Sequence, residues 1–173
     1  PDGSRLAFLS EGEVFIVDVK SGDGEKVHER MFDPGRPSWS PDGKALVLPV
    51  LRPYSSRFRE GTNQILRIGL DDKSDRYITP VAHRSVGARE DFGPVWSPDG
   101  TMMALVMDGA LAVMDVDRSG QPIGPPRRLT TDLASSPTWT GDSRRILYQT
   151  DDRLRLVSLD DGRVTDVRVD LTW

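Results

Sequence analysis

The residue types that most often perform catalysis are scarce in this sequence, and their spacing matches no catalytic motif. There are two histidines, His28 and His83, and no cysteine. Neither histidine belongs to an H-x-H or H-E-x-x-H pattern, so the common zinc-hydrolase ligand sets are missing. No G-x-S-x-G, G-x-x-x-x-G-K-[ST] or G-x-G-x-x-G occurs either. We therefore predict no catalytic residue, no metal ligand and no cofactor in this chain, and we expect it not to act as an enzyme by itself.

One acidic segment matches the first half of a calcium-binding loop. Asp115, Asp117, Ser119 and Gly120 follow the pattern D-x-D-x-S-G, but the twelfth position is Pro126 instead of an acid that could bind the ion through both oxygens. The sequence therefore predicts an acidic turn between two strands.

Two basic loops are the best candidates for binding, because arginine and aromatic side chains on exposed loops are common interface anchors. The chain carries 23 Lys+Arg against 27 Asp+Glu, a net charge of −4, which argues against a dedicated nucleic-acid binder. The first loop lies within Leu51–Asn63, and the second joins two repeats. Their candidate binding residues are Arg52, Tyr54, Arg57, Phe58 and Arg59 in the first loop and His83 and Arg84 in the second.

The roles of these loops stay open at the level of sequence. The first loop is also explained by a flexible hairpin extension or by a contact to a missing domain. If both loops lie on one face, they form a joint anion-binding patch, and neutralising Arg57, Arg59 and Arg84 would then weaken partner binding.

An internal repeat supplies the elements that must position these loops. The segment Pro37-Ser38-Trp39-Ser40-Pro41-Asp42-Gly43 recurs as Pro94-Val95-Trp96-Ser97-Pro98-Asp99-Gly100. It recurs again as Pro137-Thr138-Trp139-Thr140-Gly141-Asp142-Ser143, and Pro1-Asp2-Gly3-Ser4 is the back half of a fourth copy. The aspartates of the copies are 40, 57 and 43 residues apart, and an 11-residue insertion within Leu51–Asn63 lengthens the second copy. A period in the forties with four strands per unit is typical of β-propeller blades.

The local patterns agree with an all-β fold. Apolar or alternating segments bounded by turn residues predict eight strands, and no segment has a helical stripe. The strands are expected at Arg5–Leu9, Glu13–Val19, Ala45–Leu51, Gln64–Leu70, Met102–Met107, Ala110–Val116, Arg145–Thr150 and Leu154–Leu159. In the repeated motif, Pro, Asp and Gly favour a tight turn, and the Trp before it supplies an apolar face for packing between blades. The fourth copy has Gly141 and Ser143 in place of Pro and Gly, which predicts a looser or different turn.

The predicted domain is one β-propeller of about four four-stranded antiparallel blades, at approximately 1–36, 37–93, 94–136 and 137–173. The first blade lacks its first strand, and Leu171-Thr172-Trp173 matches the segment that would replace it. Three arrangements remain open, namely a closed four-bladed ring, a larger ring completed by two chains, and an arc of a longer protein. Because residue 1 is Pro1, we expect a fragment of a longer chain, and no signal peptide is visible.

The Trp-Ser-Pro-Asp-Gly turn followed by a strand resembles the TolB-like, or PD40, propeller repeat over essentially the whole chain. Neither the Gly-His nor the Trp-Asp dipeptide of WD40 repeats occurs. Known members imply periplasmic or extracellular binding scaffolds, or propellers fused to hydrolases such as prolyl-oligopeptidase-type peptidases and amidohydrolases. The segment from Asp132 to Trp173 is most similar to the propeller that precedes an amidohydrolase domain.

The sequence therefore favours a non-catalytic propeller that binds a protein or peptide. The alternative is an accessory propeller of a larger secreted hydrolase whose catalytic residues lie outside this chain. The expected partner is a protein, a peptide or a fused catalytic domain. A second copy of the chain that completes the ring is a further option. Nucleic acid is not expected, nor is membrane insertion, because no apolar run is long enough.

Overall fold

The computed structural model describes residues 2–55, 60–88 and 92–170, which form fifteen strands in four antiparallel sheets. The predicted all-β class is confirmed, and no helix of the length and apolarity needed to cross a bilayer occurs among these residues. The first sheet contains β1 (Arg5–Ser10), β2 (Glu13–Asp18) and β3 (Gly24–His28). The second contains β4 (Ser38–Trp39), β5 (Ala45–Pro53), β6 (Gly61–Gly69) and β7 (Asp75–Ile78). The third contains β8 (Val95–Trp96), β9 (Met102–Met107), β10 (Ala110–Asp115) and β11 (Arg127–Arg128). The fourth contains β12 (Ser135–Trp139), β13 (Arg145–Gln149), β14 (Leu154–Ser158) and β15 (Val164–Val167).

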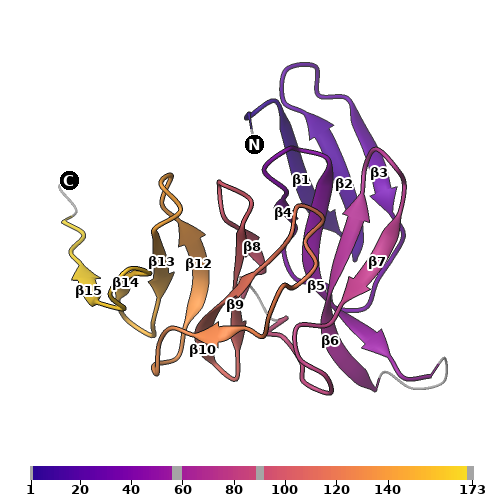
Figure 1. The fold of residues 1–173 in the computed structure, drawn as a ribbon. Coiled ribbons are helices and arrows are strands. Elements are labelled where there is room, and N and C mark those ends of the chain that lie inside the picture. Colours follow the sequence, from indigo (N-terminus) through magenta and orange to yellow (C-terminus); the bar gives the residue numbers. More distant parts are fainter. Residues whose placement is uncertain (1, 56–59, 89–91, 171–173) are drawn as a thin grey trace.

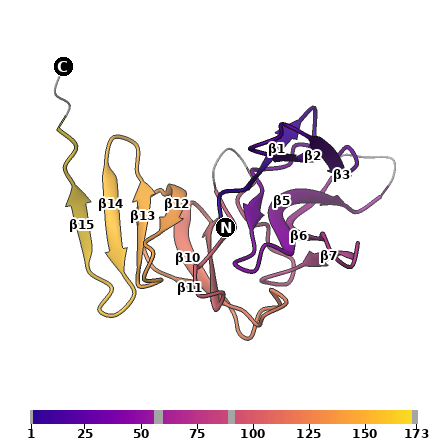
Figure 2. The ribbon, with the colours of Figure 1, turned by 90° about the horizontal axis from the view of Figure 1, so that it is seen from above.

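Each sheet is one blade of a β-propeller, and we number the blades 1 to 4 in chain order. Figure 1 shows the blades following one another from indigo to yellow, and both Figure 1 and Figure 2 place blade 1 and blade 4 at opposite ends of the row. The predicted four-blade architecture is confirmed. Within the described residues, blade 1 has three strands and each of the other blades has four.

The insertion in blade 2 lengthens a hairpin. Strands β5 and β6 pair without interruption as far as Arg52 opposite Thr62 and Pro53 opposite Gly61. The matching hairpin of blade 3, β9–β10, ends at Met107 opposite Ala110. The first basic loop is therefore the end of a hairpin that extends beyond its neighbours, as one of the sequence alternatives predicted.

The repeated turn has the same bonding in each complete copy. In blade 2, the Oδ1 atom of Asp42 accepts hydrogen bonds from the Ser40 hydroxyl at 2.6 Å and from the Lys44 amide at 3.1 Å. The Gly43 amide donates to the Ser40 carbonyl at 2.9 Å, with Gly43 at a φ of 69°. The aspartate thus closes the turn, and glycine adopts the left-handed backbone at no steric cost.

The expectation of a looser turn in blade 4 is wrong. Ser143 adopts a φ of 58°, and its amide donates to the Thr140 carbonyl at 3.0 Å, as Gly43 does in blade 2. Asp142 still accepts hydrogen bonds from Thr140 and Arg144. The Ser143 hydroxyl also accepts a bond from the Asp99 amide at 3.1 Å. These bonds offset the cost of a left-handed serine and tie the turns of blades 3 and 4 together.

Three apolar clusters lie between consecutive blades and form the core. The cluster between blades 1 and 2 includes Val14 and Leu48, the cluster between blades 2 and 3 includes Val47 and Leu105, and the cluster between blades 3 and 4 includes Ala104 and Tyr148. The motif tryptophans contribute one each: Trp39 packs against the first cluster, Trp96 is part of the second and Trp139 is part of the third. The predicted packing role of these side chains is confirmed.

Two leucines at the same register position test this packing. Leu46 and Leu6 each lie four residues after the turn aspartate, but Leu46 is fully buried whereas Leu6 is 56% exposed. We expect Leu46→Ala to lower the free energy of unfolding by about 2–5 kcal/mol, because it leaves a cavity between blades 1 and 2. Leu6→Ala is the matched control and should cost less than about 1 kcal/mol in dilute solution. The free energies of unfolding are measured by urea denaturation. If Leu46→Ala and Leu6→Ala lower this free energy equally, the core assigned to Leu46 is wrong.

The turn aspartates also predict an acid dependence of stability. The Ser40 hydroxyl lowers the pKa of Asp42 below its ordinary value. Burial raises the pKa of Asp99, but hydrogen bonds from Ser97 and Thr101 outweigh it, so that this pKa is lowered as well. A carboxyl with a lowered pKa in the folded state stabilises the fold above the unfolded-state pKa, near 4, and this contribution is lost as the pH falls through the folded-state pKa.

We therefore expect the urea midpoint to fall between about pH 5 and pH 2. The double variant Asp42→Asn with Asp99→Asn should be less stable at neutral pH and should lose less stability on acidification. If the urea midpoint of the double variant falls as much on acidification as that of the original protein, these turns do not cause the pH dependence.

Candidate binding site

The predicted binding residues that the structure describes belong to the β5–β6 hairpin and to the loop between β7 and β8. Arg52 is in β5 and Tyr54 follows that strand with 72% of its surface exposed. The Tyr54 amide donates to the Glu60 carbonyl at 2.8 Å, which narrows the end of the hairpin. Arg57, Phe58 and Arg59 lie outside the described residues, so their predicted role stays a prediction.

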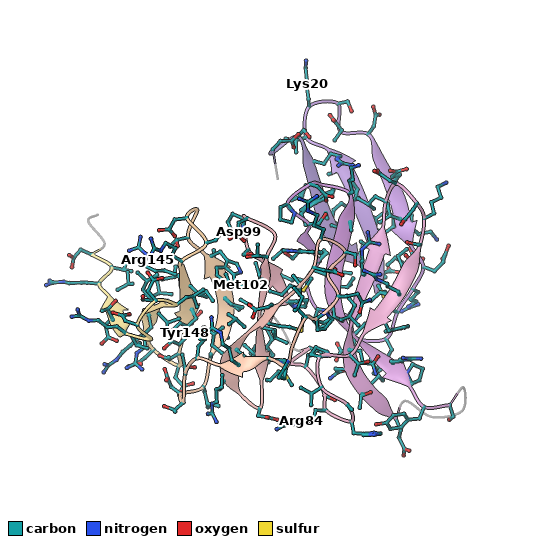
Figure 3. The ribbon with its side chains drawn as sticks, viewed as in Figure 1. Lys20, Arg84, Asp99, Met102, Arg145 and Tyr148 are labelled. Carbon is teal, nitrogen blue, oxygen red and sulfur yellow. The ribbon has the colours of Figure 1, made fainter. Side chains whose placement is uncertain are left out.

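The second basic loop is attached to this hairpin. The Val86 amide donates to the Asn63 carbonyl at 2.9 Å, and the Ser85 hydroxyl accepts a bond from the Asn63 amide at 3.1 Å. Figure 3 shows Arg84 at the end of the molecule opposite the Asp99 turn, and in Figure 1 the β5–β6 hairpin extends toward the same end. The two loops therefore do share one face, which we call the hairpin face.

The described arginines of the hairpin face already have partners within the chain. Arg84 forms a salt bridge with Asp108 of the β9–β10 turn, and both side chains are more than half exposed. The Arg52 guanidinium lies over the Tyr77 ring at 5.1 Å from its centre and donates to the Gln64 Oε1 atom at 3.3 Å. An incoming anion would have to compete with Asp108 for Arg84. This arrangement favours a mixed polar and aromatic contact surface over a dedicated anion site.

A groove of about 370 Å³ runs across the first strands of blades 2, 3 and 4. These strands, β4, β8 and β12, are neighbours in space. The groove is lined by residues 36–39, 93–95 and 136–138, which are the segments just before and within the three inner strands.

The inner strands combine a rigid support with a free edge. Within the described residues, each of β4, β8 and β12 is the first strand of its sheet and pairs only with the next strand. The Trp139 indole donates to the Val95 carbonyl at 2.9 Å, and the Ser38 hydroxyl accepts a bond from the Trp96 amide at 3.4 Å. These bonds hold the inner strands at fixed spacing and already use the Val95 carbonyl and the Trp96 amide of β8. An extended chain could pair with the other backbone groups along the edges of these strands.

A cluster of titratable side chains, Tyr148, Asp132 and Arg155, lies between blades 3 and 4. The Tyr148 hydroxyl donates to the Asp132 Oδ2 atom at 3.1 Å, and Arg155 donates to the same oxygen at 2.9 Å. Burial and the Asp132 carboxylate raise the pKa of Tyr148 to about 12. Burial also raises the pKa of Asp132, but its own backbone amide, Arg155 and Tyr148 lower it by more. At neutral pH the tyrosine is therefore protonated and the aspartate ionised, an arrangement that suits packing better than proton transfer.

The acidic segment after β10 forms a turn, as predicted. The Asp117 Oδ1 atom accepts hydrogen bonds from the Ser119 amide at 2.8 Å, the Ser119 hydroxyl at 2.6 Å and the Gln121 amide at 3.0 Å. The hydroxyl bond is the largest cause of the lowered pKa of Asp117. No cluster of three or more His, Asp or Glu side chains suited to a metal occurs in the described ranges.

Sequence reasoning missed the groove residues, although the repeat contains a signal for them. Pro37 and Pro94 stand directly before β4 and β8, and Pro137 lies within β12. Each proline is followed by a small or β-branched residue, namely Ser38, Val95 or Thr138. Such recurrence at the inner strand of three blades marks positions that share the lining of one groove. From the sequence, the repeated motif was used only for the turn and for the packing of its Trp.

No family model matches the sequence. A segment of 55 residues is 33% identical to an uncharacterized peptidase, YuxL, of Bacillus subtilis. That match covers 29% of this chain and 8% of the relative, so the chain spans less than a tenth of the curated relative that it matches.

Solved structures match nearly the whole chain. The TolB structure of Acinetobacter baumannii has a TM-score of 0.74 at 19% identity and covers 96% of this chain and 41% of that one. A putative TolB of Agrobacterium tumefaciens has a TM-score of 0.72 at 18% identity, with coverages of 96% and 61%. The tricorn protease matches with a TM-score of 0.54 at 17% identity and coverages of 96% and 21%. The chain is thus a four-bladed portion of β-propeller with the fold of the TolB proteins.

Proposed function

We propose that this chain is a non-catalytic TolB-like propeller that binds an extended segment of a protein or peptide in the groove of the inner strands. The observation that carries the proposal is that three blades present equivalent inner strands along one groove. A row of strand edges recognises the backbone of an extended chain, and the repeat spacing supplies the same contact three times.

The lining of the groove suits a peptide better than a small polar ligand. Trp39 is half-buried and provides an aromatic surface in the groove. The Arg5 guanidinium lies over its ring, at 4.8 Å from the ring centre. Pro94 and Pro137 are buried, so they shape the floor, whereas Ser38 and Thr138 offer hydroxyls. Backbone pairing with a few side-chain contacts gives binding with moderate sequence preference.

The hairpin face extends this site. Arg52 and Tyr54 lie at the end of the β5–β6 hairpin, which is longer than the β9–β10 hairpin of blade 3, and Tyr54 is exposed. Arginine and tyrosine are frequent anchors at protein interfaces. A bound segment would therefore continue from the groove onto these side chains, and the predicted residues His83, Arg84, Arg57, Phe58 and Arg59 belong to the same proposed contact.

Blocking the groove tests the proposal. Linear peptides selected from a display library against the immobilised chain serve as probes, and their affinity is measured by calorimetry. We expect Thr138→Trp, which fills the groove from an exposed position, to weaken binding of groove-selected peptides by about tenfold or more. Thr131→Trp is the matched control, since Thr131 is exposed and does not line the groove.

Two results would overturn this function. One is that the selection yields no peptide that binds the folded chain. The other is that selected peptides bind Thr138→Trp and Thr131→Trp with equal affinity, in which case the peptide site lies elsewhere on the surface.

A second candidate function is an accessory propeller of a larger hydrolase. The partial match to a Bacillus subtilis peptidase and the likeness to the tricorn protease favour it. In this function the groove and the hairpin face would hold substrate or the catalytic domain, and the chemistry would lie outside residues 1–173. The coding sequence beyond Trp173 discriminates the two: a G-x-S-x-G or H-x-H motif there supports the hydrolase.

The likeness to the TolB structures supports two further parts of the proposal, namely a periplasmic or extracellular location and a single propeller domain over residues 1–173. A fusion of the chain, with its natural upstream coding sequence, to a reporter that is active only outside the cytoplasm checks the location.

A further inference from the structure

A second hollow, of about 290 Å³, lies between blades 3 and 4. Its lining combines the apolar residues Phe92, Leu133 and Ala134 with the polar end of the β13–β14 hairpin, residues 149–151. Its volume is just below the range of about 300–1,000 Å³ that is typical of pockets for drug-sized ligands, so it suits a side chain better than a whole small molecule. We call this hollow the interblade pocket.

The linkers between blades show that the fold does not require an apolar residue at Leu133. Each linker donates one backbone amide to the hairpin of the blade before it, and the three bonds, each 2.9 Å long, join Met31 to Gly12, Val86 to Asn63 and Ala134 to Gly109. The residues that precede these amides occupy equivalent positions, and they are Arg30, Ser85 and Leu133. Because Arg30 and Ser85 are polar, the stacking of blades does not explain Leu133, which is 65% exposed.

The Leu133 side chain is nevertheless held in place. Gly109 has a φ of 77°, and a β-carbon at this position would come within 2.7 Å of the Leu133 Cδ2 atom. The leucine therefore lies directly on the backbone of the β9–β10 turn. Asp108 of the same turn pairs with Arg84, which places the pocket on the hairpin face. An exposed apolar side chain that is fixed in this way is a preformed contact for another apolar group.

The interblade pocket adjoins the groove of the inner strands. Phe92 and Ser135 line the pocket, and the next residue of each segment, Gly93 and Ser136, lines the groove. The two hollows therefore meet along two separate segments of the chain. A polypeptide bound across β8 and β12 would reach the pocket within a few residues.

A single charge marks the rim of the pocket. Of the described residues that line it, only Asp151 is charged, and this side chain is exposed. The next residue, Asp152, pairs with Arg153 at 3.5 Å, whereas no basic side chain of the described ranges pairs with Asp151. A cation beside an apolar group therefore complements the pocket.

We propose that the interblade pocket is a side-chain subsite of the groove. It receives an apolar side chain of the bound segment, while a neighbouring lysine or arginine of that segment pairs with Asp151. Contact with Leu133 and Phe92 removes apolar surface of both partners from water. Because Asp151 is exposed, the ion pair selects the segment more than it strengthens binding. The inference rests on the proposed function and adds the chemistry of its ligand, an extended chain with an apolar and a basic residue side by side.

Replacing Leu133 tests the apolar contact. The peptides selected against the immobilised chain are the probes, and the affinity of each is also measured for Thr138→Trp. We expect Leu133→Ser, which copies the equivalent Ser85, to weaken their binding by about fivefold or more. Ile123→Ser is the matched control, since Ile123 is 72% exposed and lines neither hollow.

A double-mutant cycle tests the ion pair. We expect Asp151→Asn to weaken binding by about threefold, and in this variant glutamine in place of the basic residue of the peptide should have no further effect. Asp152→Asn is the control, because Asp152 belongs to the same turn but does not line the pocket.

A crosslink locates the peptide without relying on a loss of affinity. The chain has no cysteine, so a peptide with cysteine in place of its apolar residue can form a disulfide with Leu133→Cys only at that residue. We expect mild oxidation to link this pair in preference to the same peptide with Ile123→Cys.

The outcomes separate the subsite from the groove. Binding that Thr138→Trp weakens but Leu133→Ser and Asp151→Asn leave unchanged would retain the groove and overturn the subsite, as would equal crosslinking at residues 133 and 123. Binding that depends on Leu133 and Asp151 but not on Thr138 would support the pocket alone and overturn the groove function.

Discussion

The structure depends on the burial of one blade's apolar face against the next blade. A single blade is a small twisted sheet whose two faces are largely apolar, so it has no stable form by itself in water. Each of the three internal interfaces covers one apolar face of each of two consecutive blades, and the fully buried residues of the described chain are concentrated there. Everything else, including the groove and the hairpin face, is held in place by this stacking, since the inner strands contact one another only because their blades are packed.

The turns set the register that makes this stacking repeatable. Each turn aspartate bonds the hydroxyl two residues before it and the amide two residues after it, which fixes where the next strand begins. Residues at a given distance from the aspartate therefore face the same neighbour in every blade. Functional variation is then confined to positions that the stacking does not use, namely the inner edges and the ends of the hairpins, of which β5–β6 is extended.

Much of the fold could be predicted from sequence because the repeat carries strong local signals. The bounds of the eight central strands, from Arg5 to Leu159, agree with the prediction to within two residues, except that β6 begins at Gly61, three residues before the predicted Gln64. Alternation and turn chemistry both mark these strands. The outer strands β3, β7, β11 and β15 had no such signal, because they are short and mostly exposed. The turn at Ser143 was misjudged because its stability comes from bonds to Asp142 and to the neighbouring blade. A shared face of the two basic loops was one possibility at the level of sequence. The groove could not be predicted, because it is formed by three segments that are far apart in the sequence and meet only in the folded chain.

Hydrogen–deuterium exchange, resolved by strand and followed in dilute solution, tests the central claim that stacking between blades stabilises the chain. For residues 1–173 alone, the account predicts the slowest exchange in β5, β6, β9 and β10, whose blades are covered on both faces. It predicts faster exchange in β1 and β2 of blade 1 and in β14 and β15 of blade 4, because each of these blades packs on one other blade within the described residues. Equal protection in all four blades would contradict the account, because the end blades would then be stable without a covering partner.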